Sequence, residues 1–320
     1  MCSPDVVCVG LIVADHVSAP IEAFPPAGGL VTTPKLELTI GGCAANVAVD
    51  LARLNVPTAI VGRVGNDPLG GYVRDVLAES GVDSSQIVLS DTAQTSATLV
   101  VNVAGEDRRF IHAVGANAEL TGAEVTDALI REAKVLYVGG FGLNAALSGE
   151  RVAELFQRAR AANVQTLLDV VVGDPAQVRE MLVPALPWTD LFLPNVDEAR
   201  ALTGREDPRE QIEAFLEAGA KTVVVTAGPA GVFLGNQEGT RLSVPAHQVE
   251  QIDGTGGGDA FAAGFMYGLL QEADPADCLQ FGAAMGASCV QHPGATTGVF
   301  DESQLREFVM SHRLTVAVQA

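Results

Sequence analysis

Short apolar runs alternate with helical patterns along most of this 320-residue chain. Runs that are apolar throughout are typical of strands buried on both faces of a parallel sheet. They read VVCVGLIV, TAIVGRVG, VLYVGG, TLLDVVV, LFLPN and TVVVTAG. Helices are expected between them, near residues 44–54, 72–80, 150–162, 197–202 and 209–218. The alternation predicts an α/β fold, a three-layer α/β/α sandwich around a mainly parallel central sheet.

Two stretches interrupt this alternation. Residues 96–114, SATLVVNVAGEDRRFIHAV, predict two strands joined by a turn around Gly105, Glu106 and Asp107. Residues 16–40 form a segment that contains Pro and Gly, lies outside the strand–helix alternation and ends in the strand-like KLELTI. We expect both stretches to form a small β-sheet lid over a ligand crevice at the carboxyl ends of the strands. Residues 1–320 would then be one domain with lid segments at about 16–40 and 96–114.

The charge of the chain limits its partners. Its 19 basic and 39 acidic residues give a formal net charge of -20, which repels nucleic acid and anionic membranes. Because of this net charge, a phosphate group would need favourable binding groups placed locally at its own site. Five cysteines without CxxC spacing argue against a disulfide framework or a zinc site. The start of the chain lacks a basic segment followed by an apolar stretch and enters a strand-like run, so no signal peptide is expected. We expect a cytoplasmic protein with no nucleic-acid or membrane partner.

A cluster of glycines stands directly before a lone carboxylate in DGTGGGDAFAAGF, residues 253–265. The small and apolar residues after Asp259 predict a helix, so Gly256, Gly257 and Gly258 would lie at its N-terminus, where unpaired N–H groups attract anions. A carboxylate at such a site can accept a proton while the N–H groups hold negative charge that develops on a neighbouring group. The alternative is an Asp that only favours a first helical turn.

Polar residues also follow or precede the apolar runs near the start of the chain. Gly41 and Gly42 stand at the entrance to a helix, and Asn46 can both donate to and accept from a hydroxyl group. Asp15 stands just beyond the first run, where its two oxygens can accept from adjacent hydroxyls of a polyol. The plainer alternatives are a loop-to-helix junction and a turn residue. His16 has no second His or Cys at ligand spacing, which favours a packing or lid role.

Two further motifs follow later runs. Asn195 and Glu198 open a helix after LFL, either as a helix cap or as groups near a hydrated Mg²⁺. Thr226, Gly228 and Gly231 end another run, as a simple turn between strands or as a phosphate-binding loop. The chain has neither a Walker A pattern nor the protein-kinase motifs, so ATP chemistry would need another architecture.

These motifs, in this order, resemble those of the ribokinase-like (PfkB) carbohydrate kinase family over nearly the whole chain. GANAEL at 115–120 is also similar to a stretch common in ribokinases. The resemblance implies that sugar is bound by Asp15, Gly41, Gly42 and Asn46. It implies that Asn195 and Glu198 order phosphate and Mg²⁺, the ion being reached from Glu198 through water. It further implies that ATP is contacted by Thr226, Gly228 and Gly231.

The resemblance also implies a reaction. Asp259 would take the proton of a sugar hydroxymethyl group as it attacks the γ-phosphoryl group of ATP, and Gly256–Gly258 would form the anion hole. The helix dipole is expected to help keep Asp259 ionised. A monovalent cation, K⁺, is implied on a mostly backbone site formed by Asp253, Thr255, Cys289, His292, Gly294 and Gly298. A homodimer that pairs through the lid is implied as well.

Several departures leave the substrate open. Gly254 stands where the family often has Thr, and Cys43 and Ala44 replace residues of the GGKGAN pattern of ribokinases proper, which weakens the case for ribose. A nucleoside kinase would need an aromatic slot, for which the lid offers little beyond Phe24 and Phe110. A phosphosugar kinase would need a cationic clamp such as Arg108 with Arg109. A protein of another class, a non-catalytic sugar-binding regulator, would not need the base.

Overall fold

The computed structural model describes residues 3–106 and 109–318, and this part of the chain contains one large sheet and one small sheet. The large sheet has the strand order β14-β13-β12-β11-β10-β9-β8-β1-β4-β5. Its strands from β11 to β5 pair in parallel, whereas β12, β13 and β14 form an antiparallel edge. The strand bounds are β1 (Val6–Gly10), β4 (Thr58–Gly65), β5 (Asp83–Ser90), β8 (Val135–Phe141), β9 (Gln165–Val170), β10 (Leu191–Phe192), β11 (Thr222–Thr226), β12 (Val232–Asn236), β13 (Arg241–Val244) and β14 (Ala317–Val318).

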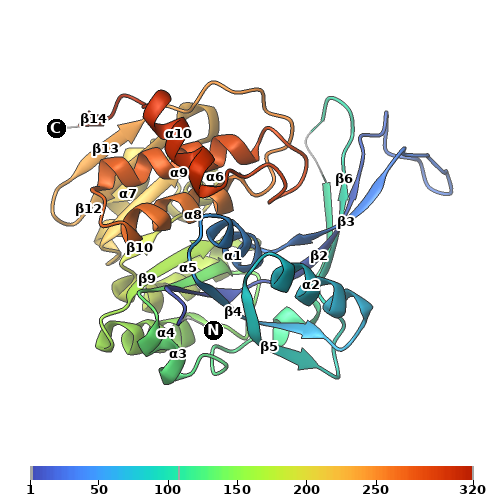
Figure 1. Cartoon of the computed structure of the whole chain (residues 1–320), viewed down its shortest axis with the longest axis horizontal. Helices are drawn as coiled ribbons and strands as arrows, with labels where there is room; N and C mark the ends of the chain where they lie inside the picture. Colours follow the sequence, from blue (N-terminus) through green and yellow to red (C-terminus); the bar gives the residue numbers. More distant parts are fainter. Residues whose placement is uncertain (1–2, 107–108, 319–320) are drawn as a thin grey trace.

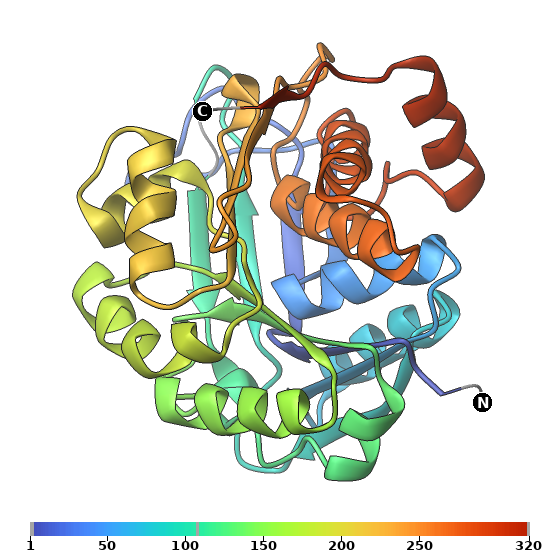
Figure 2. The same cartoon turned by 90° about the vertical axis from the view of Figure 1, so that its left-hand side faces the viewer.

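Helices cover both faces of the large sheet, as Figure 2 shows. Successive residues of β1 point to opposite sides: Val6 and Cys8 enter one apolar cluster, and Val7 and Val9 enter the other. The first face is covered by α1 (Cys43–Arg53), α2 (Pro68–Glu79), α8 (Gly257–Leu270), α9 (Pro275–Cys289) and α10 (Glu302–Ser311). The second is covered by α3 (Asp127–Glu132), α4 (Gly149–Ala161), α5 (Pro175–Ala185), α6 (Val196–Thr203) and α7 (Pro208–Glu217). The predicted three-layer α/β/α sandwich is confirmed.

The small sheet stands beside the main domain (Figure 1). Its strand order is β3-β2-β6-β7, with bounds β2 (Val13–Ser18), β3 (Leu36–Gly41), β6 (Ala97–Val101) and β7 (Arg109–Ala113). The strands predicted at the end of 16–40 and within 96–114 are present. Asp107 and Arg108 lie outside the described residues.

The first strand was predicted wrongly as one run through Val13. The chain leaves the large sheet at Gly10, whose φ of 144° and closeness to Gly139 O, 2.1 Å from an added Cβ, exclude other residues. It re-forms a strand at Val13, so the small sheet begins before residue 16. Asp15 therefore lies within a strand of the small sheet, paired with Thr39 and Thr98, and does not follow β1 directly.

Candidate active site

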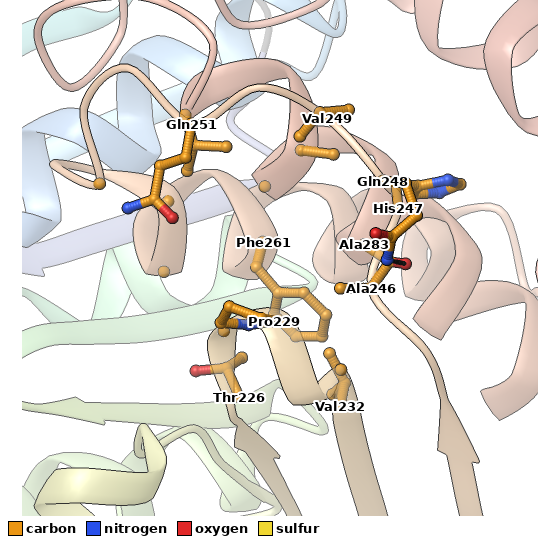
Figure 3. A pocket seen from close by; sticks show the side chains of 18 residues that line it. Thr226, Pro229, Val232, Ala246, His247, Gln248, Val249, Gln251, Phe261 and Ala283 are labelled. Atoms are coloured by element: carbon orange, nitrogen blue, oxygen red, sulfur yellow. Dashed lines mark hydrogen bonds between the residues drawn. The ribbon is translucent and has the colours of Figure 1, made fainter.

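Two adjoining cavities open where the small sheet faces the carboxyl ends of the parallel strands. The first, of about 530 Å³, is lined by acidic side chains from four elements, and we call it the acidic cavity. These side chains are Asp15 (β2), Asp169 (β9), Glu198 (α6) and Asp259 (α8). The second, of about 320 Å³, is lined mostly by small and apolar residues, and we call it the Phe261 cavity. In Figure 3 the ring of Phe261 lies between Pro229 and Ala246. Thr226, Gly258 and Phe261 line both cavities.

Asp259 lies in the first turn of α8, as predicted. Gly256 caps this helix in a left-handed conformation with φ 77°, and an added Cβ there would lie 2.5 Å from Ala295 O. An added Cβ on Gly258 would meet nothing within 4 Å, so its glycine keeps the space at the junction of the cavities open. Gly257 N donates a long bond of 3.4 Å to Gly254 O. The first-turn N–H groups thus lie beside the carboxylate.

The carboxylate of Asp259 is held by Asn46, whose Nδ2 donates to Oδ2 at 2.8 Å. Burial raises the pKa of Asp259 to about 6, an effect opposed by the hydrogen bonds from Asn46 and Cys43 and reinforced by the charge of Asp15. Burial therefore outweighs the hydrogen bonds that favour the ionised form. The expectation that the helix dipole helps keep Asp259 ionised stays a prediction. A pKa of about 6 still leaves most of Asp259 ionised at neutral pH.

Two further residues meet Asp259: Asp169, which the sequence prediction missed, and Cys43, which it named only as a departure from the family motif. Ligand atoms of Cys43, Asp169 and Asp259 all lie within 4.8 Å of one another. Tyr137 donates its hydroxyl to Asp169 Oδ2 at 3.1 Å, and burial, with the charges of Asp259 and Glu198, raises the pKa of Asp169 well above its usual range. Burial and the same acidic neighbours raise the pKa of the Cys43 thiol, which keeps it protonated. The available signal for Asp169 was its position as the one charged residue in the run TLLDVVV.

The glycine pair before α1 makes room for Asp15 and for the turn. A Cβ on Gly41 would lie 1.9 Å from Asp15 Oδ2, and a Cβ on Gly42, whose φ is 91°, would lie 2.5 Å from Leu11 O. Asp15 Oδ1 and Asn46 Oδ1 are buried and have no hydrogen-bond partner among the described residues. Burial raises the pKa of Asp15. Such acceptors suit the hydroxyl groups of a polyol.

The motif Asn195–Glu198 forms the helix cap that was one of its two interpretations. Asn195 Oδ1 accepts from Asp197 N at 3.0 Å and from Glu198 N at 2.9 Å, and Glu198 Oε2 accepts from Asn195 N at 2.9 Å. Glu198 nevertheless lines the acidic cavity, where burial raises its pKa to about 7. The cap therefore holds the Glu198 carboxylate through Oε2 and leaves Oε1 outside the capping box.

The motif of Thr226, Gly228 and Gly231 forms the turn between β11 and β12 and lines the Phe261 cavity. Ala227 N donates to Gly231 O at 2.8 Å and closes the turn. Gly231 has φ 93°, and an added Cβ would lie 2.1 Å from Val244 O. Gly228 has φ 50° with open space around it, which leaves its backbone accessible from the cavity.

The loop after α9 lies against the segment that precedes α8. Asp253 accepts from Thr255 N at 2.9 Å, from Thr255 Oγ1 at 2.7 Å and from Gly294 N at 2.9 Å. The Cys289 thiol lies 3.3 Å from Thr255 O and 3.1 Å from Ala295 O, so two carbonyl oxygens converge there. A Cβ on Gly298 would lie 2.0 Å from the ring of His292, which gives these two residues a packing role.

The cationic and aromatic candidates of the predicted lid segments are only partly at the site. Arg108 lies outside the described residues. Arg109 pairs with Glu106 and lies over the ring of Phe24, 5.8 Å from its centroid, and it does not line the acidic cavity. Phe110 does line the cavity, as do two residues that the sequence prediction missed. These are Thr98 and His112, joined by a 3.1 Å hydrogen bond.

Known proteins share both the sequence and the fold of this chain. The model of the pfkB family carbohydrate kinases matches residues 3–302. A ribokinase of Haemophilus influenzae is 29% identical over 308 residues, 94% of this chain and 97% of the relative. An aminoimidazole riboside kinase of Salmonella typhimurium is 29% identical over 289 residues, 87% of this chain and 90% of the relative. The structure of Arabidopsis thaliana ribokinase complexed with ribose and ATP superimposes with a TM-score of 0.84 at 25% identity, covering 97% of this chain and 99% of that one. The chain therefore belongs to the pfkB family of carbohydrate kinases and is a phosphotransferase that acts on a sugar hydroxyl.

Proposed function

We propose that this kinase transfers the γ-phosphoryl group of ATP to a primary hydroxyl of a small, uncharged sugar or polyol. The observation that carries this proposal is the position of Asp259 beside Gly258, at the junction of the acidic cavity and the Phe261 cavity. With the sugar in the acidic cavity and the nucleotide in the Phe261 cavity, the acceptor hydroxyl and the γ-phosphate would meet beside the carboxylate of Asp259. ATP in the Phe261 cavity would contact Thr226 and the turn at Gly228.

The residues at the junction support an in-line transfer. Asp259 accepts the hydroxyl proton as the oxygen attacks phosphorus, so the nucleophile gains charge as the bond to the leaving ADP oxygen breaks. The N–H groups of Gly256–Gly258, at the positive end of α8, stabilise the charge on the transferring group. Asp15 orients the sugar by accepting from its other hydroxyls, and Asn46, whose Nδ2 donates to Asp259, lies beside it in the acidic cavity.

The charge of the acidic cavity supports an uncharged acceptor. Its lining within the described residues includes Asp15, Asp169, Glu198 and Asp259 but neither Lys nor Arg. A phosphorylated or carboxylated sugar would enter against these charges without a cation to bind it. The phosphosugar alternative is therefore disfavoured. The nucleoside alternative remains second, because Phe110 is the aromatic side chain that the small sheet contributes to this cavity and its side chain is half exposed.

The residues of the site fit the metal ions that the resemblance implies. Glu198 presents a carboxylate of the acidic cavity close to the junction, and hydrated Mg²⁺ commonly takes one or two such oxygens besides phosphates and waters. Mg²⁺ would shield the charge on the phosphates and so assist the transfer. The carbonyls of Thr255 and Ala295, beside the Asp253 carboxylate, are the oxygens best placed for K⁺ in the loop after α9. The side chain of His292 takes no part.

The remaining parts of the proposal concern the whole chain. We propose that residues 1–320 form one kinase domain, that the small sheet is its lid, and that two copies pair through it. The free cysteines Cys8, Cys43, Cys278 and Cys289 support a cytoplasmic location. No helix in the described residues is long and apolar enough to cross a membrane.

The test is a panel of sugars, phosphosugars and nucleosides, with ADP release as the readout and with Mg²⁺ and K⁺ each omitted or replaced in turn. We expect a neutral sugar or polyol to give the highest kcat/KM. A nucleoside or a phosphosugar that exceeds every neutral sugar would overturn the substrate class, and no ADP release with any acceptor would favour the non-catalytic regulator. Equal rates in K⁺ and Na⁺ at matched ionic strength would reject the proposed K⁺ site.

The same assay tests the base. Asp259→Asn is nearly isosteric and keeps the glycines, so the loss should fall on kcat, by about 10²- to 10⁴-fold, with KM close to that of the unmodified enzyme. Asp15→Asn is the matched control for ground-state contacts and should raise the sugar KM more than it lowers kcat. If Asp259→Asn kept more than about a tenth of kcat, a residue other than Asp259 would be the base.

A further inference from the structure

Asp50 is a carboxyl group in the core that the proposed reaction does not use. It lies in α1, its side chain is 0% exposed, and neither of its oxygens has a hydrogen-bond partner among the described residues. A charged carboxylate in such a place is strongly disfavoured, because no donor replaces its lost hydration. Burial, with the charge of Asp259, raises the pKa of Asp50 well above its usual range, although Arg53 opposes the shift. Burial therefore favours the neutral form of Asp50, which has an O–H group to donate.

An acceptor for that O–H group stands one turn earlier on the same helix. Asn46 is four residues before Asp50, and side chains with this spacing are neighbours on one helix face, with Cβ atoms about 5–6 Å apart. Asn46 is 4% exposed, and its Oδ1 is buried without a partner among the described residues. Its Nδ2, in contrast, donates to Asp259 Oδ2 at 2.8 Å. Two adjacent side chains thus have complementary unmet hydrogen-bonding capacity.

We propose that Asp50 is a positioning residue: its carboxyl group donates a hydrogen bond to Asn46 Oδ1 and holds the amide with Nδ2 toward Asp259. The inference rests on the proposed role of Asp259 as the base. Rotation of the amide by half a turn would place Oδ1 against the Asp259 carboxylate and turn Nδ2 toward Asp50. A donor at Asp50 disfavours that rotation. Asp259 then keeps the hydrogen bond that favours its ionised form.

Other ionisable groups face these residues without replacing the interaction. Arg53, on the same helix, donates its Nη1 to Val299 O at 3.0 Å. Cys289, at the end of α9, directs its thiol to the carbonyls of Thr255 and Ala295. The groups that face Asp259 from the elements around it are Cys43 on α1, Asp15 on β2, Tyr137 on β8, Asp169 on β9 and Glu198 on α6.

The test compares Asp50→Asn with Asp50→Leu. The Asn side chain still donates through its NH₂ group, so the pH profile of kcat/KM should match that of the unmodified enzyme. Leu fills a similar volume but cannot donate. The acidic limb of the profile, where kcat/KM falls with falling pH, should therefore move to higher pH by on the order of one unit. The kcat should also fall, while the KM for ATP is kept. A merely structural role would change thermal stability in one or both variants without moving the pH profile.

Two results would overturn the inference. An acidic limb that stays in place in Asp50→Leu would show that Asp50 does not act on the base. A limb that moves to lower pH in Asp50→Asn would show that Asp50 acts through a negative charge, which the substitution removes.

Infrared spectroscopy keeps the inference testable if Asp50→Leu does not fold. At mildly alkaline pH the folded enzyme should show a protonated-carboxyl C=O band that Asp50→Asn removes, and the absence of this difference would refute the neutral acid. The band does not depend on turnover. Retained activity in Asp259→Asn would therefore reject the proposed base while the band at Asp50 remained readable, so the two failures are distinguishable.

Discussion

At the scale of single residues, the site sets two requirements against each other. Asp259 must be ionised to accept a proton, yet it lies in a cavity where burial raises its pKa to about 6 and where Asp15 adds to the shift. Asn46 opposes the shift through its hydrogen bond. A base whose pKa lies slightly below neutral pH combines a mostly ionised ground state with a useful affinity for the proton.

This balance predicts the pH dependence of the reaction. Because protonation removes the base, kcat/KM should fall as the pH drops through about 6, the pKa of Asp259. Glu198, with a pKa raised to about 7, titrates in the same region, and bound Mg²⁺ should lower its pKa by favouring the charged form. The measurement is kcat/KM against pH at saturating Mg²⁺. A profile that stays flat down to about pH 5 would contradict a base of this pKa.

Sequence reasoning found the residues whose chemistry is visible in a short motif and missed the contacts that the fold creates. Asp259 and its glycines stand together in the chain, so their proximity needed no tertiary information. Cys43 and Asp169 come from α1 and β9, and only the packing of the helix layer on the sheet brings them to Asp259. Asn46 was predicted as a sugar-binding residue, but its bond to Asp259 joins residues 213 positions apart and has no local signature.

At the scale of elements, the N-terminus of α8 joins the two cavities. The structure requires glycine at only one of two positions here. Gly256 has a positive φ and faces Ala295 O, whereas Gly258 has neither constraint. An unconstrained glycine in a helix costs about 0.5–1 kcal/mol relative to Ala. The presence of glycine at position 258 is explained if the transferring phosphoryl group occupies the space that a Cβ would fill.

Substitution of Gly258 by Ala therefore separates stability from activity. We expect Gly258→Ala to keep or raise the thermal midpoint and to lower kcat/KM by about 10- to 100-fold, because the methyl group displaces the transferring phosphoryl group. Gly71→Ala is the matched control: this helical glycine of α2 also has open space around it but lies outside both cavities. It should gain stability without loss of activity. Full activity in Gly258→Ala would place the phosphoryl group elsewhere.

Element boundaries were less predictable than the elements themselves. The run VVCVGLIV has no polar break, so nothing in its hydrophobic pattern marks the passage from β1 to β2 at Gly10. The exclusion of a Cβ at Gly10 comes from the close approach of Gly139 O on the neighbouring strand, which the local sequence does not reveal. The helix predicted near 72–80 begins earlier, at Pro68, because Asp67 caps it by accepting from Gly70 N.

At the scale of the whole molecule, the small sheet has two different faces. Strand pairing places Asp15, Thr98 and His112 side by side on the face toward the acidic cavity. The alternate residues Leu99 and Ile111 are paired on the opposite face, where the same pleat also directs Leu36. These three apolar side chains are 39%, 61% and 59% exposed, respectively. A sheet with one face over the ligand and one apolar face toward solvent fits a second copy of the chain as its cover.

The homodimer proposed above can be tested on this apolar face. Ile111→Glu places a charge on an exposed position of β7, so the fold should be retained while the pairing of two apolar faces is disrupted. We expect sedimentation analysis to show a dimer for the unmodified chain and a monomer for Ile111→Glu. Because the opposite face of the same strands contributes Asp15 and His112 to the acidic cavity, a lid without its partner should also raise the sugar KM. Met310→Glu, at a 79% exposed position of α10, is the matched control and should leave both dimer and KM unchanged. A monomeric unmodified chain at assay concentrations would reject pairing through the lid.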